Sequence, residues 1–167
     1  GATGSITNQG EIKVADGGQL VLLGANVSNQ GVLVAQKGDV VLAAGDQVTL
    51  QAGANGHLQI AVDPATLNTL IENRQLIQAD GGQVIMTSKA ANTLYSNLVS
   101  NTGTIEARSI GEQQGKVLLQ AEGPKAEVQI GGLIEVSAAA GQATVNAGEV
   151  AIQAAKITHT GIINASS

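Results

Sequence analysis

One short pattern recurs along the chain and limits what it can fold into. A glycine and a polar residue are followed by apolar residues at alternate positions, as in GQLVL at 18–22 and GQVIM at 82–86. Alternation of this kind is typical of a β-strand with one buried face. The pattern begins at Gly18, Gly38, Gly56, Gly82, Gly115 and Gly148. Repetition at roughly 20 to 30 residues predicts a solenoid, in which each coil buries its apolar face against the next.

A second pattern is a small turn followed by another short strand. An asparagine precedes this strand at Asn8, Asn29, Asn73 and Asn101. Glycines occupy equivalent turn positions at Gly10, Gly31, Gly103, Gly132 and Gly161. We expect the asparagines to form an inward side-chain ladder or Asx turns, and the glycines to form the corners of successive coils. Both sets are therefore interpreted as structural residues.

Two segments depart from the repeat and suggest short helices. The first, at 63–74, opens with Asp63 and Pro64, a cap residue followed by a first-position proline. The second, at 88–101, places Leu94 and Leu98 four residues apart. We expect one or two helical turns in each, inserted between coils.

These patterns predict an all-β fold of the parallel β-helix type with about six or seven coils. The whole of 1–167 is expected to form one domain, with regular short coils in 1–62, coils carrying the helical insertions in 63–110, and longer, looser coils in 111–167. The alternative is an antiparallel sandwich. A sandwich of this size normally buries aromatic residues, whereas this chain has one Tyr and no Phe or Trp.

Composition excludes several classes of function. The formal net charge is −5 and no Lys/Arg cluster occurs, so we expect no nucleic-acid partner. No apolar run is long enough to insert in a membrane, and the absence of cysteine excludes disulfides and thiolate metal sites. The chain begins inside a turn-and-strand pattern, so we interpret it as an internal piece whose targeting signal lies elsewhere.

No catalytic constellation stands out, and we expect neither an enzyme nor a cofactor. Asp16 and Asp80 lie three coils apart on the expected spacing, about 14 Å, too far for a catalytic pair. Asp39 is interpreted as an ordinary corner residue. His57 and His159 have no Cys or carboxylate at ligand spacing, so a corner hydrogen bond is the better interpretation for His159.

Sugar binding has one weak candidate site. Sugar sites usually offer an aromatic platform, and the chain offers only Tyr95. Tyr95 and the neighbouring Asn97 are therefore the residues we would test for ligand contact. A spacer is favoured over a receptor-binding tip.

Two stretches, VSNQGVLVAQKGDVVLAAGDQVTL at 27–50 and the segment 62–107, carry a family signal. They resemble the filamentous haemagglutinin family, large bacterial exoproteins of the two-partner secretion pathway. The similarity covers at least 5–110. The family's secretion domain bears an Asn-Pro-Asn type motif, and this sequence has no Asn-Pro pair. The resemblance therefore implies the later part of that domain or the first stretch of the shaft.

The resemblance implies a right-handed parallel β-helix, exported by an outer-membrane transporter and located outside the cell or at the bacterial surface. The expected function is a non-enzymatic shaft or secretion-domain segment of an adhesin that attaches to cells or biofilm matrix, with glycans or proteins as further partners. The alternatives are a direct exopolysaccharide-binding module and the shaft of a contact-dependent inhibition toxin. A polysaccharide lyase is disfavoured because clustered carboxylates are missing.

Overall fold

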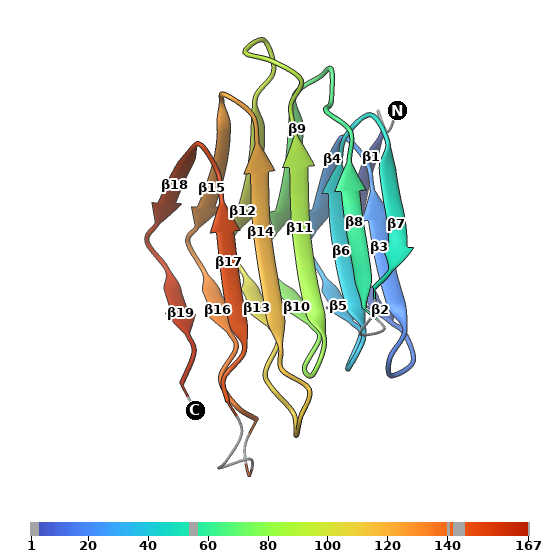
Figure 1. Ribbon diagram of the computed structural model, residues 1–167, viewed down its shortest axis with the longest axis vertical. Helices are drawn as coiled ribbons and strands as arrows, with labels where there is room; N and C mark the ends of the chain where they lie inside the picture. Colours follow the sequence, from blue (N-terminus) through green and yellow to red (C-terminus); the bar gives the residue numbers. More distant parts are fainter. Residues whose placement is uncertain (1–3, 54–56, 140, 142–145, 167) are drawn as a thin grey trace.

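The computed structural model describes residues 4–53, 57–139, 141 and 146–166, which form strands and turns and no helix. Most strands belong to three parallel sheets, named A, B and C (Figure 1). Sheet A contains β1 (Ser5–Asn8), β4 (Asn26–Asn29), β9 (Thr69–Asn73), β12 (Asn97–Asn101), β15 (Ala126–Ile130) and β18 (Lys156–His159). Sheet B contains β2 (Glu11–Lys13), β5 (Val32–Val34), β10 (Leu76–Gln78), β13 (Thr104–Glu106), β16 (Leu133–Glu135) and β19 (Ile162–Asn164). Sheet C contains β3 (Gln19–Leu23), β6 (Asp39–Ala44), β11 (Gln83–Lys89), β14 (Lys116–Glu122) and β17 (Glu149–Gln153).

The chain visits the three sheets in turn and returns to each one strand further along. Every strand of a sheet therefore lies beside its equivalent in the next coil. In sheet A, for example, Ile71 stands opposite Val27 on one side and Val99 on the other. The stack runs across Figure 1 from the N-terminal to the C-terminal end. The fold is all-β, parallel and solenoid-like, as the repeated strand pattern predicts.

Aliphatic side chains fill the narrow space between sheet C and the wall formed by sheets A and B. Each sheet contributes alternate residues, which is the period of two expected for strands. The inward rows are Val27, Ile71, Val99 and Val128 from sheet A, Leu33, Ile77, Ile105 and Ile134 from sheet B, and Val40, Leu42, Val84, Met86, Val117 and Leu119 from sheet C. Facing sheets are about 10 Å apart, so aliphatic residues fill the core without aromatic rings.

The helical insertions expected near 63–74 and 88–101 are wrong. The first segment contains β9, and the second begins within β11 and ends with β12. Both β9 and β12 are hydrogen-bonded into sheet A on both sides, which leaves their backbones no helical pairing. In β9, Ile71 is fully buried while Leu70 is half-buried, so the apolar spacing was that of a strand. Tertiary pairing overrode the local cap signal at Asp63 and Pro64.

Two strands, one at 48–52 and the one expected after Gly56, lie outside the coils. They form β7 (Val48–Ala52) and β8 (Leu58–Val62), an antiparallel hairpin outside the three sheets. Gly56 itself is outside the described residues. The inner face of the hairpin packs its aliphatic side chains over Val41 and Ile85 on the outer face of sheet C. Because 46–63 adds no coil, sheet A has six strands in the described chain.

Candidate functional site

The four asparagines picked out in the sequence form a continuous ladder at the corner between sheets A and B. Asn8 Nδ2 donates to Asn29 Oδ1, Asn29 Nδ2 donates to Asn73 Oδ1, and Asn73 Nδ2 donates to Asn101 Oδ1. Each of these distances is 2.9 Å. Asn29, Asn73 and Asn101 have no exposed surface. The ladder ends at Ile130, which stands opposite Asn101 in the next coil. These side chains hydrogen-bond one another and face away from solvent.

Each rung also binds the backbone of the following coil. Asn29 Nδ2 donates to the Leu76 carbonyl at 2.9 Å and Asn73 Nδ2 to the Thr104 carbonyl at 3.0 Å. Asn29, moreover, donates to Gly31 two residues on in its own turn. The ladder therefore joins neighbouring coils through both side-chain and backbone partners.

Of the five corner glycines, all but Gly10 are required for close approach. A Cβ added at Gly31 would lie 2.1 Å from the carbonyl oxygen of Gly10, and one at Gly132 would lie 2.1 Å from that of Gly103. Gly161 meets Gly132 at the same 2.1 Å. None of these positions has a positive φ. Tight stacking of the coils, rather than a left-handed backbone, explains the repeat of glycine here.

A pair of carboxylates that sequence reasoning missed lies on the outer side of sheet B. Gln78 Nε2 donates to both Asp80 Oδ2, at 3.3 Å, and Glu106 Oε2. Arg108 contacts both carboxyl groups. Its backbone N–H donates to Asp80 Oδ1 at 2.8 Å, and its Nη2 lies 3.0 Å from Glu106 Oε1. Asp80 is only 7% exposed. The signal that links these residues is the register of β10 with β13, which the sequence alone does not supply.

The two glutamates of this face have opposite pKa shifts. Burial and the adjacent Asp80 carboxyl raise the pKa of Glu106 above its ordinary value, and Gln78 and Arg108 only partly offset them. Burial also raises the pKa of Glu135, but hydrogen bonds from Ser137 and Asn164 outweigh it and leave that pKa lowered.

The Asp80–Glu106 pair is unsuited to glycoside hydrolysis. Both carboxyl groups accept from the same Gln78 amide nitrogen. Glycosidases instead hold their carboxyl groups roughly 5–9.5 Å apart, with the sugar bond between them. Neither residue lines any of the surface hollows described below. The arrangement joins two coils by a shared polar contact.

The remaining acidic and histidine candidates are dispersed. Asp16 and Asp80 are two coils apart instead of three, because the hairpin occupies the sequence between them. Asp39 is 1% exposed and anchors the hairpin: Oδ1 lies 3.0 Å from His57 Nδ1, and Oδ2 accepts from the Leu58 N–H at 3.3 Å. His159 stands opposite Ile130, in the asparagine column, and is exposed on the last coil.

Tyr95 and Asn97 differ in their access to solvent. Tyr95 lies in a loop and is half-buried. Asn97 is only 2% exposed, and its Nδ2 donates to Ser88 Oγ at 2.9 Å and to the Glu122 carbonyl at 3.1 Å. Of the two, Tyr95 alone presents surface to a ligand.

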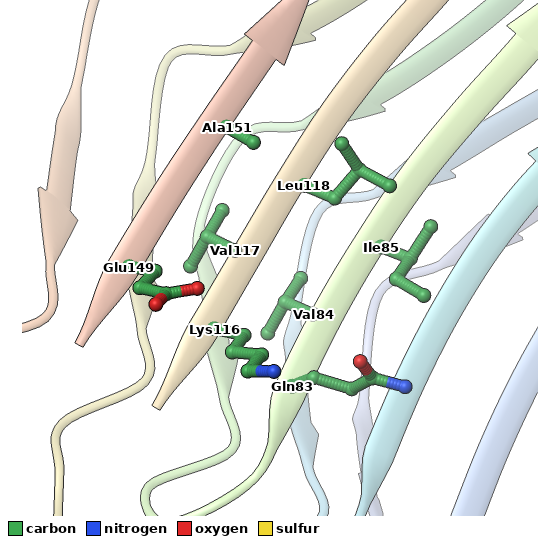
Figure 2. A pocket seen from close by; sticks show the side chains of 8 residues that line it. All are labelled: Gln83, Val84, Ile85, Lys116, Val117, Leu118, Glu149 and Ala151. Atoms are coloured by element: carbon green, nitrogen blue, oxygen red, sulfur yellow. The ribbon is translucent and has the colours of Figure 1, made fainter. Parts of the chain in front are cut away.

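The surface hollows lie on the outer faces of the sheets. One of about 190 Å³ crosses β11, β14 and β17 and is lined by Ile85, Leu118 and Ala151 together with Gln83, Lys116 and Glu149 (Figure 2). Another, of about 330 Å³, lies over Gln129, Thr158 and their neighbours on sheet A. The hollow on β11, β14 and β17 is the more apolar of the two.

Among the described residues, no group of three or more His, Cys, Asp or Glu side chains is placed to hold a metal ion. No described helix is long and apolar enough to cross a membrane. Comparison with protein-family models, with curated proteins and with solved structures finds no match to this chain.

Proposed function

We propose that this chain is a non-enzymatic spacer segment of a large secreted bacterial surface adhesin, built as a closed right-handed β-helix of about six coils. The observation that carries the proposal is the unbroken register: equivalent residues stack from coil to coil in all three sheets. Right-handed winding is the expectation for parallel strands joined in one direction. Stacked parallel strands make a stiff element that lengthens by one strand spacing per coil.

The resemblance of 27–50 and 62–107 to filamentous haemagglutinins supports the place of this spacer in a parent protein. In that setting an outer-membrane transporter of the two-partner type exports the parent, which then attaches to cells or to biofilm matrix. The polar residues that most resemble a site, the asparagine ladder and the Asp80–Glu106 pair, bond one another and join coils. Such bonding supports a spacer over an enzyme.

Removing one coil tests the spacer role. Asn73 and Asn101 stand opposite each other, so deleting 74–101 joins equivalent points of adjacent coils. We expect the shortened protein to fold and to lose about 4.8 Å along the stack, measured by small-angle X-ray scattering. Deleting only 74–87, half a coil, is the control and should abolish the fold. A shortened protein that unfolds as the control does contradicts the proposal.

Ligand and activity assays separate the spacer from its alternatives. A spacer shows no specific binding on a glycan array and releases no unsaturated uronate from acidic polysaccharides. Specific glycan binding that disappears in Tyr95→Ala would replace the spacer by a carbohydrate-binding module. Release of unsaturated uronate would show instead that the protein is a lyase.

A further inference from the structure

An apolar row runs across the outer face of sheet C and is only partly covered. It comprises the residues that stand opposite one another on the five strands, Val21, Val41, Ile85, Leu118 and Ala151. The hairpin packs against Val21, Val41 and Ile85, and Leu118 is only partly buried against the same cluster. Leu118 is half-buried and Ala151 is exposed. In Figure 1 the hairpin lies in front of β3 and β6, at the N-terminal end of sheet C, and does not extend over β14 and β17.

Beside this open part lies the free edge of β8. The bonds from Gly53 N–H to the His57 carbonyl and from Asp63 N–H to the Gln47 carbonyl show which residues face β7. Because antiparallel pairing alternates, Leu58, Ile60 and Val62 direct their N–H and C=O groups away from β7. Gln83 of β11 donates to the Leu58 carbonyl at 2.8 Å, so this edge faces β11 and the strands beyond it.

The edge is closed at one end and open at the other. Both backbone groups of Leu58 are bonded, the N–H to Asp39 and the carbonyl to Gln83. Within the described part of the chain, the outward N–H and C=O groups of Ile60 and Val62 have no hydrogen-bond partner. An edge strand with free backbone groups above an apolar floor is the arrangement used for strand addition.

We propose that an extended segment of another polypeptide adds to β8 as a third strand and lies in the hollow over β14 (Figure 2). A strand spacing of about 4.8 Å places the added strand over β11 and β14. Its inward side chains then contact Leu118 and Ala151, which are small or aliphatic. One lysine and one glutamate, Lys116 and Glu149, flank the hollow. These opposite charges favour an uncharged segment with aliphatic residues at alternate positions.

This inference is independent of the spacer role, since it rests on the hairpin and on sheet C alone. The probe is a seven-residue peptide of alternating threonine and valine with blocked ends, N-methylated along one edge so that only the other edge can pair. The control peptide is N-methylated along both edges. Amide hydrogen exchange is followed by NMR on the full chain.

We expect the probe to slow exchange at Ile60 and Val62 at least tenfold, and the control peptide to leave both rates unchanged. Leu118→Lys places a charge in the hollow and should weaken binding at least tenfold. The matched variant Gln129→Lys, on the exposed outer face of sheet A, should bind as the unaltered chain does.

Three results would overturn the proposal. The first is unchanged exchange at Ile60 and Val62 when the probe is in millimolar excess. The second is equal affinity in Leu118→Lys. The third is protection that rises with protein concentration without peptide, which would assign the edge to a second copy of the chain.

Discussion

At the corner between sheets A and B, asparagine and glycine stabilise the stack through different forces. Asparagine supplies hydrogen bonds that run from coil to coil, as from Asn73 to Asn101. Glycine has no side chain, and this lets Gly31 approach the Gly10 carbonyl. The spacing of both residues could be predicted from the sequence because the repeat itself shows it. The close approach of coils could not, since contact distances depend on register.

Asn73→Ala should lower the free energy of unfolding by about 2–4 kcal/mol, because buried partners in two coils lose a hydrogen bond. The affected groups include Asn101 Oδ1 and the Thr104 carbonyl. Urea denaturation measures the change. Gln9→Ala, which removes an exposed hydrogen bond to Gln30, should change stability by less than about 0.5 kcal/mol. Equal effects of the two variants would show that the ladder adds no stability.

Gly31→Ala and Gly10→Ala form a matched pair in one column. The new methyl group at Gly31 meets a backbone oxygen, whereas the one at Gly10 meets nothing within 4 Å. We expect Gly31→Ala to destabilise the fold by about 1–3 kcal/mol through overpacking. Gly10→Ala should be neutral or stabilise it by up to about 1 kcal/mol. Thermal unfolding distinguishes the two, and a destabilised Gly10→Ala would mean that glycine is needed there for its backbone.

Glu106→Gln should change the pH dependence of stability. The folded protein holds the Glu106 proton at pH values where the unfolded chain has released it, so stability falls as pH rises from 4.5 through the raised pKa. The variant lacks this loss, and its stability relative to the unaltered chain should rise over that interval. Urea titrations at several pH values measure the difference.

Glu135→Gln is the opposite control. The pKa of Glu135 is lowered from its ordinary value of 4.5, so its ionised carboxylate stabilises the fold at pH values above 4.5. This contribution is lost as pH falls through the lowered pKa. The variant should therefore lose stability, relative to the unaltered chain, as pH rises toward 4.5. The same sign for both variants would contradict the assigned shifts.

At the scale of elements, the β7–β8 hairpin is an addition to the stack and not a part of it. Its two ends meet through the bond from Asp46 N–H to the Asp63 carbonyl. Replacing 47–62 by two glycines should therefore leave sheets A, B and C in place. The deletion uncovers Val41 and Ile85, so we expect an unchanged far-UV circular dichroism per residue but strong binding of the dye ANS. Loss of the β-sheet signal would show that the hairpin is needed for folding.

The hairpin and the expected helices also show where sequence patterns mislead. The strand after Gly56 alternates polar and apolar residues as the strands of sheet C do, because each has a face that packs against an apolar surface. The pattern identifies a half-buried strand but does not name its partner. Likewise, Leu67, Leu70 and Ile71 fit a helix by spacing, and only the pairing of Leu70 and Ile71 in sheet A excludes it.

At the scale of the whole molecule, the stack has buried central coils and open end coils. Ile12, Leu33, Ile77 and Ile105 occupy one inward column. Ile105 is fully buried, whereas Ile12 on the first coil is 37% exposed. Each coil contacts only its neighbours, so burial in this column depends on having a coil on both sides.

Ile105→Ala should cost about 2–5 kcal/mol of unfolding free energy, because the cavity has neighbours on every side. Ile12→Ala makes the same chemical change at the exposed end and should cost less than about 1.5 kcal/mol. Guanidinium denaturation of both variants checks the difference. Comparable losses would indicate that the first coil is covered in solution.

The sequence by itself determined the strand pattern, the corner residues and the aliphatic core, because each follows from a local period that repeats along the chain. Only the tertiary structure showed which strands stack and which form a hairpin, because backbone pairing is independent of side-chain alternation. The Asp80–Glu106 contact and the free edge of β8 arise between residues of different coils or elements. Distances across the stack are set by register, so no local pattern records them.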